Sequence, residues 1–188
     1  MIPEIERWFE TQYWQPKPYQ REAWLAYRNG ESGLINVPTG GGKTYSALMG
    51  PLAELAQAPN DGLHILYISP LRALGYDISL AIEKPAVFLN PKMTCGLRTG
   101  DTAAKERVAQ NKKLPHILIT TPESLALLLT QKDRQKLVKN LRCVIVDEWH
   151  ELMRTKRGSL LELNLSYLRQ LQPKLQTWGL SATLGNTE

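Results

Sequence analysis

Residues 37–44 read Val37-Pro38-Thr39-Gly40-Gly41-Gly42-Lys43-Thr44. In a glycine-rich turn that ends in Lys-Thr, backbone N–H groups can surround phosphates, and the following helix adds the partial positive charge of its N-terminus. Lys43 would reach the β- and γ-phosphates, and the hydroxyl of Thr44 would offer a ligand to Mg²⁺, a hard cation that prefers oxygen. The string therefore predicts a site for ATP and Mg²⁺ formed by Thr39, Gly40, Gly41, Gly42, Lys43 and Thr44.

A second ligand for that cation is predicted much further along the chain. The apolar run 141–146 predicts a buried strand, and Asp147 stands at its carboxyl end. Ligands of open α/β sheets bind at that edge, so Asp147 is expected to help Thr44 hold Mg²⁺. Glu148, directly beside it, is expected to orient or deprotonate the attacking water, because phosphoryl transfer depends on positioning and charge neutralisation.

A third string, Ser181-Ala182-Thr183, follows the last apolar run. On its own it could be a turn that caps a loop. The three strings occur in one order along the chain, and the first two each follow an apolar run that predicts a strand. Together they predict a nucleotide-hydrolysing motor domain.

Strands and helices are predicted to alternate along the rest of the sequence. Runs with strand character end at turn clusters such as Pro59-Asn60-Asp61-Gly62, and segments with helical spacing follow them. This alternation predicts an α/β fold with a mainly parallel sheet covered by helices on both faces. The expected strands are 33–37, 63–69, 95–99, 116–120, 141–146 and 176–180, and the expected helices are 2–14, 19–28, 43–58, 71–82, 102–110, 124–129 and 159–171.

Composition sets limits on this interpretation. The 188 residues, 43% of them hydrophobic and 22% charged, fit one globular domain with an ample core. The net charge of +5 suits a polyanionic partner. Cys95 and Cys143 both fall in expected strands, so they are predicted to be small buried side chains rather than a disulfide or metal pair. We find no leader and no apolar run long enough to span a bilayer, and we expect a soluble protein of the reducing cytoplasm.

Further motifs stand between these strings, and together they span almost the whole chain: 69–74 (SPLRAL), 98–101 (RTGD), 120–125 (TTPESL), 147–152 (DEWHEL) and 179–185 (GLSATLG). In this order they resemble the first RecA-like domain of a superfamily 2 helicase of the DExH group. Trp149 inside the Asp-Glu-x-His box, followed by Lys156-Arg157-Gly158, makes the chain most similar to the Lhr-type, ligase-associated DNA damage response helicases of bacteria. Val37 replaces the leading glycine of the strict phosphate-loop pattern, as is normal in this superfamily.

The resemblance implies roles for residues on which spacing alone is silent. Gln20 resembles the helicase Q-motif glutamine, whose amide pairs with the adenine edge, although by itself it reads as an ordinary helix-surface residue. The aromatic residue that stacks on the base stays unassigned, because Phe9, Tyr13 and Trp14 compete. The resemblance assigns to His150 the link between nucleotide state and the coupling residues Ser181 and Thr183.

The resemblance also implies a path for one strand of nucleic acid. Each matching residue follows or ends an expected strand, where hydroxyls, backbone N–H groups and a helix N-terminus can meet phosphates without reading sequence. Thr121-Pro122 reads equally as a helix start, and both readings can hold together. Lys156 and Arg157 could touch the strand or simply be solvated. The positions matched by the resemblance are Pro70, Arg72, Gly100, Thr121 and Ser124.

For the organisation of the protein, we expect residues 1–188 to be a single RecA-like ATP-binding domain with a helical lead-in at 1–30. Intact members of the family carry a second, C-terminal RecA-like domain, with arginines that reach the γ-phosphate, and we expect that domain to be absent from this chain. The resemblance also implies repair ligases or nucleases as partners. Without the second domain we expect little hydrolysis.

Three functions are compatible with these motifs. The first is an ATP-driven motor that moves on single-stranded DNA. The second is an RNA-directed DExH helicase, since contacts to phosphates are nearly indifferent to the 2′-hydroxyl. The third is a non-hydrolysing nucleotide-dependent scaffold, against which the intact Lys43, Thr44, Asp147 and Glu148 argue.

Overall fold

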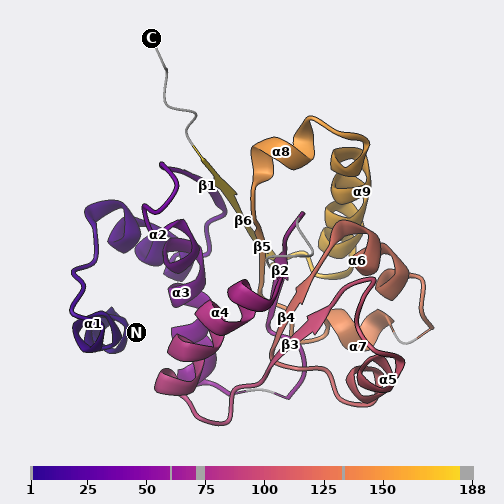
Figure 1. Cartoon of the computed structure of the whole chain (residues 1–188), viewed down its shortest axis with the longest axis horizontal. Coiled ribbons are helices and arrows are strands. Elements are labelled where there is room, and N and C mark those ends of the chain that lie inside the picture. The colour runs from indigo at the N-terminus through magenta and orange to yellow at the C-terminus, as the bar shows by residue number, and fades with distance from the viewer. Residues whose placement is uncertain (1, 60, 71–74, 133, 183–188) are drawn as a thin grey trace.

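The computed structural model describes residues 2–59, 61–70, 75–132 and 134–182. In these residues six strands, all parallel, form one sheet in the order β1-β6-β5-β2-β4-β3. This confirms the predicted parallel sheet (Figure 1). The strands are β1 (Gly33–Asn36), β2 (Ile65–Ile68), β3 (Cys95–Arg98), β4 (Ile117–Thr120), β5 (Cys143–Val146) and β6 (Gln176–Ser181).

Helices cover both faces of the sheet. Helices α1 to α4 pack on one face, to the left in Figure 1, and α6 to α9 pack on the other. Helix α5 lies against the edge strand β3, where the Gln110 amide donates to the Leu97 carbonyl. The helices are α1 (Ile2–Thr11), α2 (Pro18–Arg28), α3 (Lys43–Gln57), α4 (Gly75–Leu89), α5 (Ala104–Lys112), α6 (Pro122–Leu129), α7 (Arg134–Val138), α8 (Trp149–Met153) and α9 (Lys156–Leu171).

The central strands are buried on both faces. Because successive strand residues point to opposite faces, Ile65 and Tyr67 of β2 join the core under α1 to α4, whereas Leu66 and Ile68 join the core under α6 to α9. Strands β4 and β5 are buried in the same way. This two-sided burial explains why these strands read as continuous apolar runs rather than as alternating patterns.

The carboxyl ends of the strands lie in register. Ile68 pairs with Val146 on one side and with Thr120 on the other, and Asn36 pairs with Ser181. We call the edge at which these strands end the carboxyl edge, and the opposite edge the amino edge. Helices α3, α6 and α8 begin close after β1, β4 and β5, so their N-termini gather at the carboxyl edge.

The first helix is shorter than predicted. Helix α1 ends at Thr11 instead of Trp14, because Tyr13 has a φ of +57°, which a right-handed helix cannot contain. Phe9 and Trp14 nevertheless stay close, with ring centroids 6.3 Å apart. The chain therefore turns sharply before α2.

Two further boundaries were wrong because a proline and a glycine sit inside helices. Helix α4 continues through Pro85 to Leu89, and its predicted start at residues 71–74 lies outside the described residues. Helix α9 begins before Gly158, not after it. A Cβ at Gly158 would lie 2.7 Å from the Leu152 carbonyl oxygen, so glycine is needed for α9 to pack on α8. The short helices α7 and α8 were not predicted.

The two cysteines are separate. Cys143 is buried, Cys95 is partly buried, and both are free thiols. Burial raises the pKa of each thiol well above its usual value, which makes both weak nucleophiles. Among the helices that the structure describes, none has the length and apolar character needed to cross a membrane.

Candidate functional site

The glycine-rich turn links β1 to α3 at the carboxyl edge. Gly40 and Gly42 have φ values of +77° and +93°, a backbone conformation that glycine adopts without strain. A Cβ at Gly41 would lie 2.9 Å from the Pro38 carbonyl oxygen. The turn thus requires its glycines, and it ends directly at the N-terminus of α3, as an anion-binding loop should.

Lys43, the first residue of α3, is buried. Its Nζ atom has no hydrogen-bond partner among the described residues. The nearest acid is Glu148, whose Oε1 lies 3.6 Å from Nζ, an ion-pair distance rather than a hydrogen bond. A buried ammonium normally keeps hydrogen-bond partners, so this one is poised for an additional anionic ligand.

The lead-in segment braces the turn from behind. The Gln20 Nε2 donates to the Gly42 carbonyl at 3.1 Å, and the Tyr19 hydroxyl donates to the Gly41 carbonyl. The Gln20 Oε1 accepts from the backbone N–H of Lys17 at 2.8 Å. Helix α2 therefore holds the phosphate loop through its first turn, and the adenine-pairing role of Gln20 stays a prediction.

Asp147 and Glu148 follow β5 at the same edge. The Asp147 Oδ2 accepts from the Tyr67 hydroxyl at 2.8 Å, and its Oδ1 accepts from the backbone N–H of Glu148 at 2.9 Å. Glu148 has a φ of +45°, so a non-glycine residue occupies the left-handed region directly beside the predicted ligand. Such strain persists where the surroundings impose it, as at functional sites.

His150 joins this group to the last strand. The hydroxyl of Ser181 lies 3.1 Å from the His150 Nδ1, and that nitrogen lies 3.7 Å from the Glu148 Oε2. The structure thus brings Lys43, Glu148, His150 and Ser181 into one continuous chain of contacts. Thr183, the other predicted coupling residue, lies outside the described residues.

The predicted nucleic-acid residues occupy the same edge beyond β2 and β4. The Thr121 side chain caps α6 by accepting from the Ser124 N–H at 3.3 Å, and both side chains are largely buried. The Arg157 guanidinium donates to the Pro70 carbonyl at 2.8 Å and to the Glu123 carboxylate at 3.0 Å. Arg157 of α9 therefore links the residue after β2 to the first turn of α6. Arg72 lies outside the described residues.

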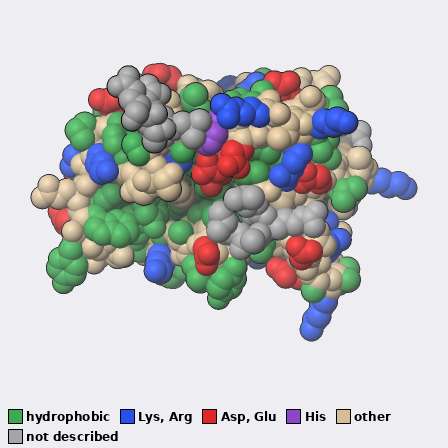
Figure 2. Space-filling model, turned by 45° about the horizontal axis from the view of Figure 1, so that its top comes forward, with side chains coloured by type: hydrophobic (Ala, Val, Ile, Leu, Met, Phe, Trp, Pro, Cys, Tyr) green, Lys and Arg blue, Asp and Glu red, His purple; other side chains and the backbone are tan. Residues whose placement is uncertain are grey.

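Gly100 lies on the turn after β3. Its carbonyl accepts from the Arg107 guanidinium of α5. In Figure 2, where the top of Figure 1 comes forward, basic and acidic side chains are intermingled rather than gathered into a patch of one sign. On this face, hydroxyls and backbone groups are therefore better placed than a basic patch to meet a strand.

The DEAD/DEAH box helicase family matches residues 17–188 of this sequence. The chain belongs to this family. The Lhr helicase/probable uracil glycosylase of Mycolicibacterium smegmatis is 41% identical over 94% of the chain, and the ATP-dependent helicase Lhr-Core protein 2 of Thermococcus barophilus is 38% identical over 96%. The structure of the Mycobacterium smegmatis helicase Lhr bound to ssDNA and AMP-PNP superposes with a TM-score of 0.87 and 38% identity over 96% of the chain. The chain is thus a helicase domain homologous to Lhr helicases.

This helicase domain is similar to only part of those proteins. It spans 13% and 23% of the length of the two Lhr relatives and 24% of the chain in the Lhr structure. The DUF1998 helicase MrfA bound to DNA has a TM-score of 0.83 at 23% identity, which shows that the RecA-like fold is shared.

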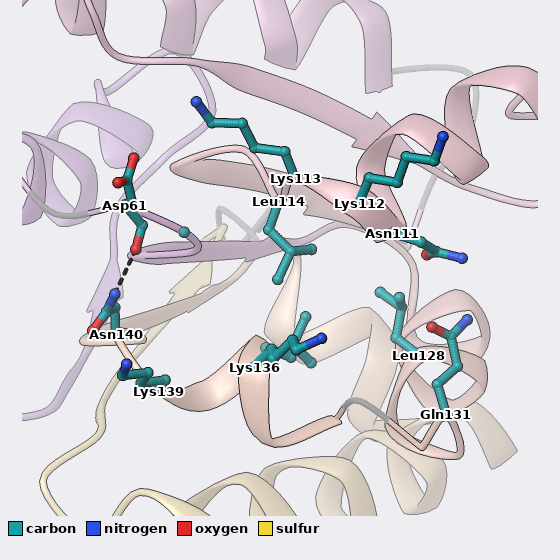
Figure 3. A pocket seen from close by; sticks show the side chains of 12 residues that line it. Asp61, Asn111, Lys112, Lys113, Leu114, Leu128, Gln131, Lys136, Lys139 and Asn140 are labelled. Atoms are coloured by element: carbon teal, nitrogen blue, oxygen red, sulfur yellow. Dashed lines mark hydrogen bonds between the residues drawn. The ribbon is translucent and has the colours of Figure 1, made fainter.

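A pocket of about 500 Å³ lies at the amino edge of the helicase domain. Figure 3 shows Lys112, Lys113, Lys136 and Lys139 around a floor that includes Leu114 and Leu128. The pocket shares no residue with the predicted ATP site. This pocket therefore lies apart from the helicase motifs, at the opposite edge of the sheet.

The sequence analysis did not predict the contacts of two residues at this edge. Tyr67 bonds to Asp147, and Arg157 links Pro70 to Glu123. A phenol in an otherwise aliphatic buried strand was the one available sign of Tyr67. For Arg157, the sequence indicates only a strand contact or a solvated side chain.

Proposed function

We propose that this chain is the ATP-binding and hydrolysing motor domain of a DNA helicase, which couples hydrolysis to movement along single-stranded DNA. The observation that carries the proposal is the buried Lys43 ammonium, which lacks a hydrogen-bond partner among the described residues and lies where a glycine-rich turn meets a helix N-terminus. A nucleotide triphosphate supplies the anionic oxygens that this arrangement can bind.

The residues at the carboxyl edge also fit Mg²⁺. The Asp147 carboxylate accepts from the Tyr67 hydroxyl, and Thr44 lies in the first turn of α3, which begins at the same edge. Oxygen donors of this kind suit a hard divalent cation. When bound, Mg²⁺ neutralises charge that develops on the phosphate oxygens. In this proposal, Thr44 and Asp147 hold the cation, while Thr39 and Gly40 to Gly42 surround the phosphates.

Glu148 is the proposed base. Its carboxylate lies between Lys43 and His150, with oxygens 3.6 Å and 3.7 Å from their nitrogens. A γ-phosphate that pairs with the Lys43 ammonium in place of Glu148 would free the Glu148 carboxylate to orient the attacking water. His150 and Ser181 would then transmit the release of Glu148 to β6, because their side chains lie 3.1 Å apart.

Nucleic acid is proposed to lie along Pro70, Gly100, Thr121 and Ser124, together with Arg72. The Lhr structure, which is 38% identical and has ssDNA bound, supports DNA over RNA. The RNA-directed alternative is supported only by a shared fold, since the DEAD-box helicase Mss116 bound to ssRNA is 23% identical. The low proportion of the relatives that the chain covers supports a second RecA-like domain in the intact protein. DNA repair in a reducing cytoplasm, with ligase or nuclease partners, is the setting that the resemblance suggests.

Calorimetric titration with AMP-PNP and Mg²⁺ tests the nucleotide site. Lys43→Ala should weaken binding by about 10- to 100-fold, because a charge-assisted contact to phosphate is lost. Lys105→Ala, which changes an exposed lysine of α5, should leave affinity unaltered. Equal affinities for wild type and Lys43→Ala would refute the site. A scaffold would bind nucleotide but would show no ssDNA-stimulated hydrolysis in the intact protein.

A further inference from the structure

Tyr67 is a buried polar side chain that the proposed function has not yet used. It is the third residue of β2, it has no exposed surface, and its neighbours in the strand are Ile65, Leu66 and Ile68. Its ring belongs to the core between the sheet and α3. A buried phenol needs a hydrogen-bond partner, and an aliphatic residue would fill this place without one.

The partner of the Tyr67 hydroxyl lies just beyond the neighbouring strand. The hydroxyl donates to the Asp147 Oδ2 at 2.8 Å. Asp147 comes within reach because β2 and β5 are adjacent, with Ile68 opposite Val146. Thr44, the other proposed ligand, lies in the first turn of α3, which begins at the same edge of the sheet.

The carboxylate of Asp147 is consequently held at both oxygens. Oδ2 accepts from Tyr67, and Oδ1 accepts from the N–H of Glu148. The carboxylate orientation is therefore set by the fold before any ligand arrives.

We propose that Tyr67 is a positioning residue that holds the Asp147 carboxylate in the orientation needed to bind the Mg²⁺ of the nucleotide. This inference rests on the proposed ATP site and deepens it. Groups that orient metal ligands commonly change metal affinity by about 10- to 100-fold when they are removed. Tyr67 has the geometry of such a group, because its hydroxyl contacts Asp147 from the apolar side of the site.

The test is the Mg²⁺ dependence of AMP-PNP binding by the chain, measured by calorimetry. Tyr67→Phe should raise the Mg²⁺ concentration for half-maximal binding by about 10-fold or more. Binding in EDTA should change less than about two-fold, because Lys43 and the glycines are untouched. Tyr27→Phe is the matched control: it removes a buried phenol that donates to the Glu54 carboxylate at the amino edge, and the Mg²⁺ requirement should not move.

A double-mutant cycle separates positioning from general damage. In the Asp147→Asn background, Tyr67→Phe should shift the Mg²⁺ requirement less than about two-fold, since no carboxylate remains to be oriented. A Tyr67→Phe protein with the wild-type Mg²⁺ requirement would overturn the inference alone. If Lys43→Ala left nucleotide binding intact, the proposed ATP site itself would fail. Should Tyr67→Phe not fold, NMR of tyrosine-labelled wild type decides: addition of Mg²⁺ to the AMP-PNP complex should shift the Tyr67 resonance, and an unmoved resonance refutes the inference.

Discussion

Each edge of the sheet holds a cluster of polar side chains, and the two clusters differ in how completely their charged groups are hydrogen-bonded. At the amino edge, Glu54 accepts from the Tyr27 hydroxyl and from the Arg142 guanidinium at 3.1 Å, and the Nε2 of buried His64 lies 3.6 Å away. At the carboxyl edge, Lys43 lacks a hydrogen-bond partner in the described part of the chain. The Glu54 carboxylate is thus surrounded by its partners, whereas the Lys43 ammonium has no hydrogen-bond partner among the described residues.

Backbone geometry separates the two edges as well. Both edges contain glycines at positive φ, but the carboxyl edge also contains Glu148, a non-glycine residue at positive φ, and three helix N-termini lie nearby. The amino edge receives the C-terminal ends of α2 and α3, which favour cations rather than anions. The difference teaches that the amino edge is built for stability, whereas the carboxyl edge keeps a strained residue and a buried ammonium without a hydrogen-bond partner among the described residues.

The largest expected effect is on the amino edge. Glu54→Ala removes the shared partner of Tyr27, His64 and Arg142, so it should lower the free energy of unfolding by about 3 kcal/mol. Urea denaturation measures this cost. Glu6→Ala, which breaks an exposed pair with Arg21 at 2.9 Å, should cost less than about 1 kcal/mol.

Nucleotide affinity, unlike stability, should not depend on Glu54. At a temperature where Glu54→Ala is folded, its affinity for AMP-PNP should match that of wild type, because Glu54 contacts no residue that is predicted to bind the nucleotide. If Glu54→Ala cost no more stability than Glu6→Ala, the amino-edge cluster would not be structural and the contrast between the edges would be broken.

A somewhat smaller effect concerns pH. The neighbouring imidazole of His64, 3.6 Å away, and then the hydrogen bond from the Tyr27 hydroxyl lower the pKa of Glu54 to about 2 against its partial burial. A carboxylate with a lowered folded-state pKa stabilises the fold above its unfolded pKa, and this stabilisation is lost as pH falls toward the folded value. Between about pH 5 and pH 2, wild type should therefore lose on the order of 2 kcal/mol more than Glu54→Gln. Denaturation at several pH values checks this, and parallel pH profiles for the two proteins would contradict it.

The carboxyl edge was largely predictable because its residues lie in short local motifs. The phosphate loop follows a strand and opens a helix, and Asp147 ends an apolar run. In a parallel sheet all such strand ends meet at one edge, whatever the order of the strands. Alternation therefore predicts that the phosphate loop and Asp147-Glu148 lie at the same edge, where the Lys43 Nζ and the Glu148 Oε1 are 3.6 Å apart.

The contacts that depend on strand order and packing could not be predicted. Tyr67 reaches Asp147 only because β2 lies next to β5, and alternation of strands and helices does not determine that order. Arg157 pairs with Glu123 because α9 packs beside α6. The amino-edge cluster was missed for the same reason: its members come from α2, α3 and the segments before β2 and β5, and no motif joins them.

The smallest expected effect probes the strain at Glu148. In a helix interior, alanine is more stable than glycine by about 1 kcal/mol. At a left-handed position the order reverses, because a Cβ clashes with the backbone there. Glu148, at a φ of +45°, should therefore follow the reversed order.

Glu148→Gly should accordingly be more stable than Glu148→Ala by about 1 kcal/mol, although both variants lack the proposed base. The same pair of changes at Glu162, an exposed glutamate inside α9, should give the ordinary order, with alanine ahead. Thermal and urea denaturation of the four proteins measure the two differences. Alanine ahead of glycine at both positions would mean that Glu148 is unstrained when the protein is free in solution. The carboxyl edge would then differ from the amino edge in charge alone, and not in its backbone.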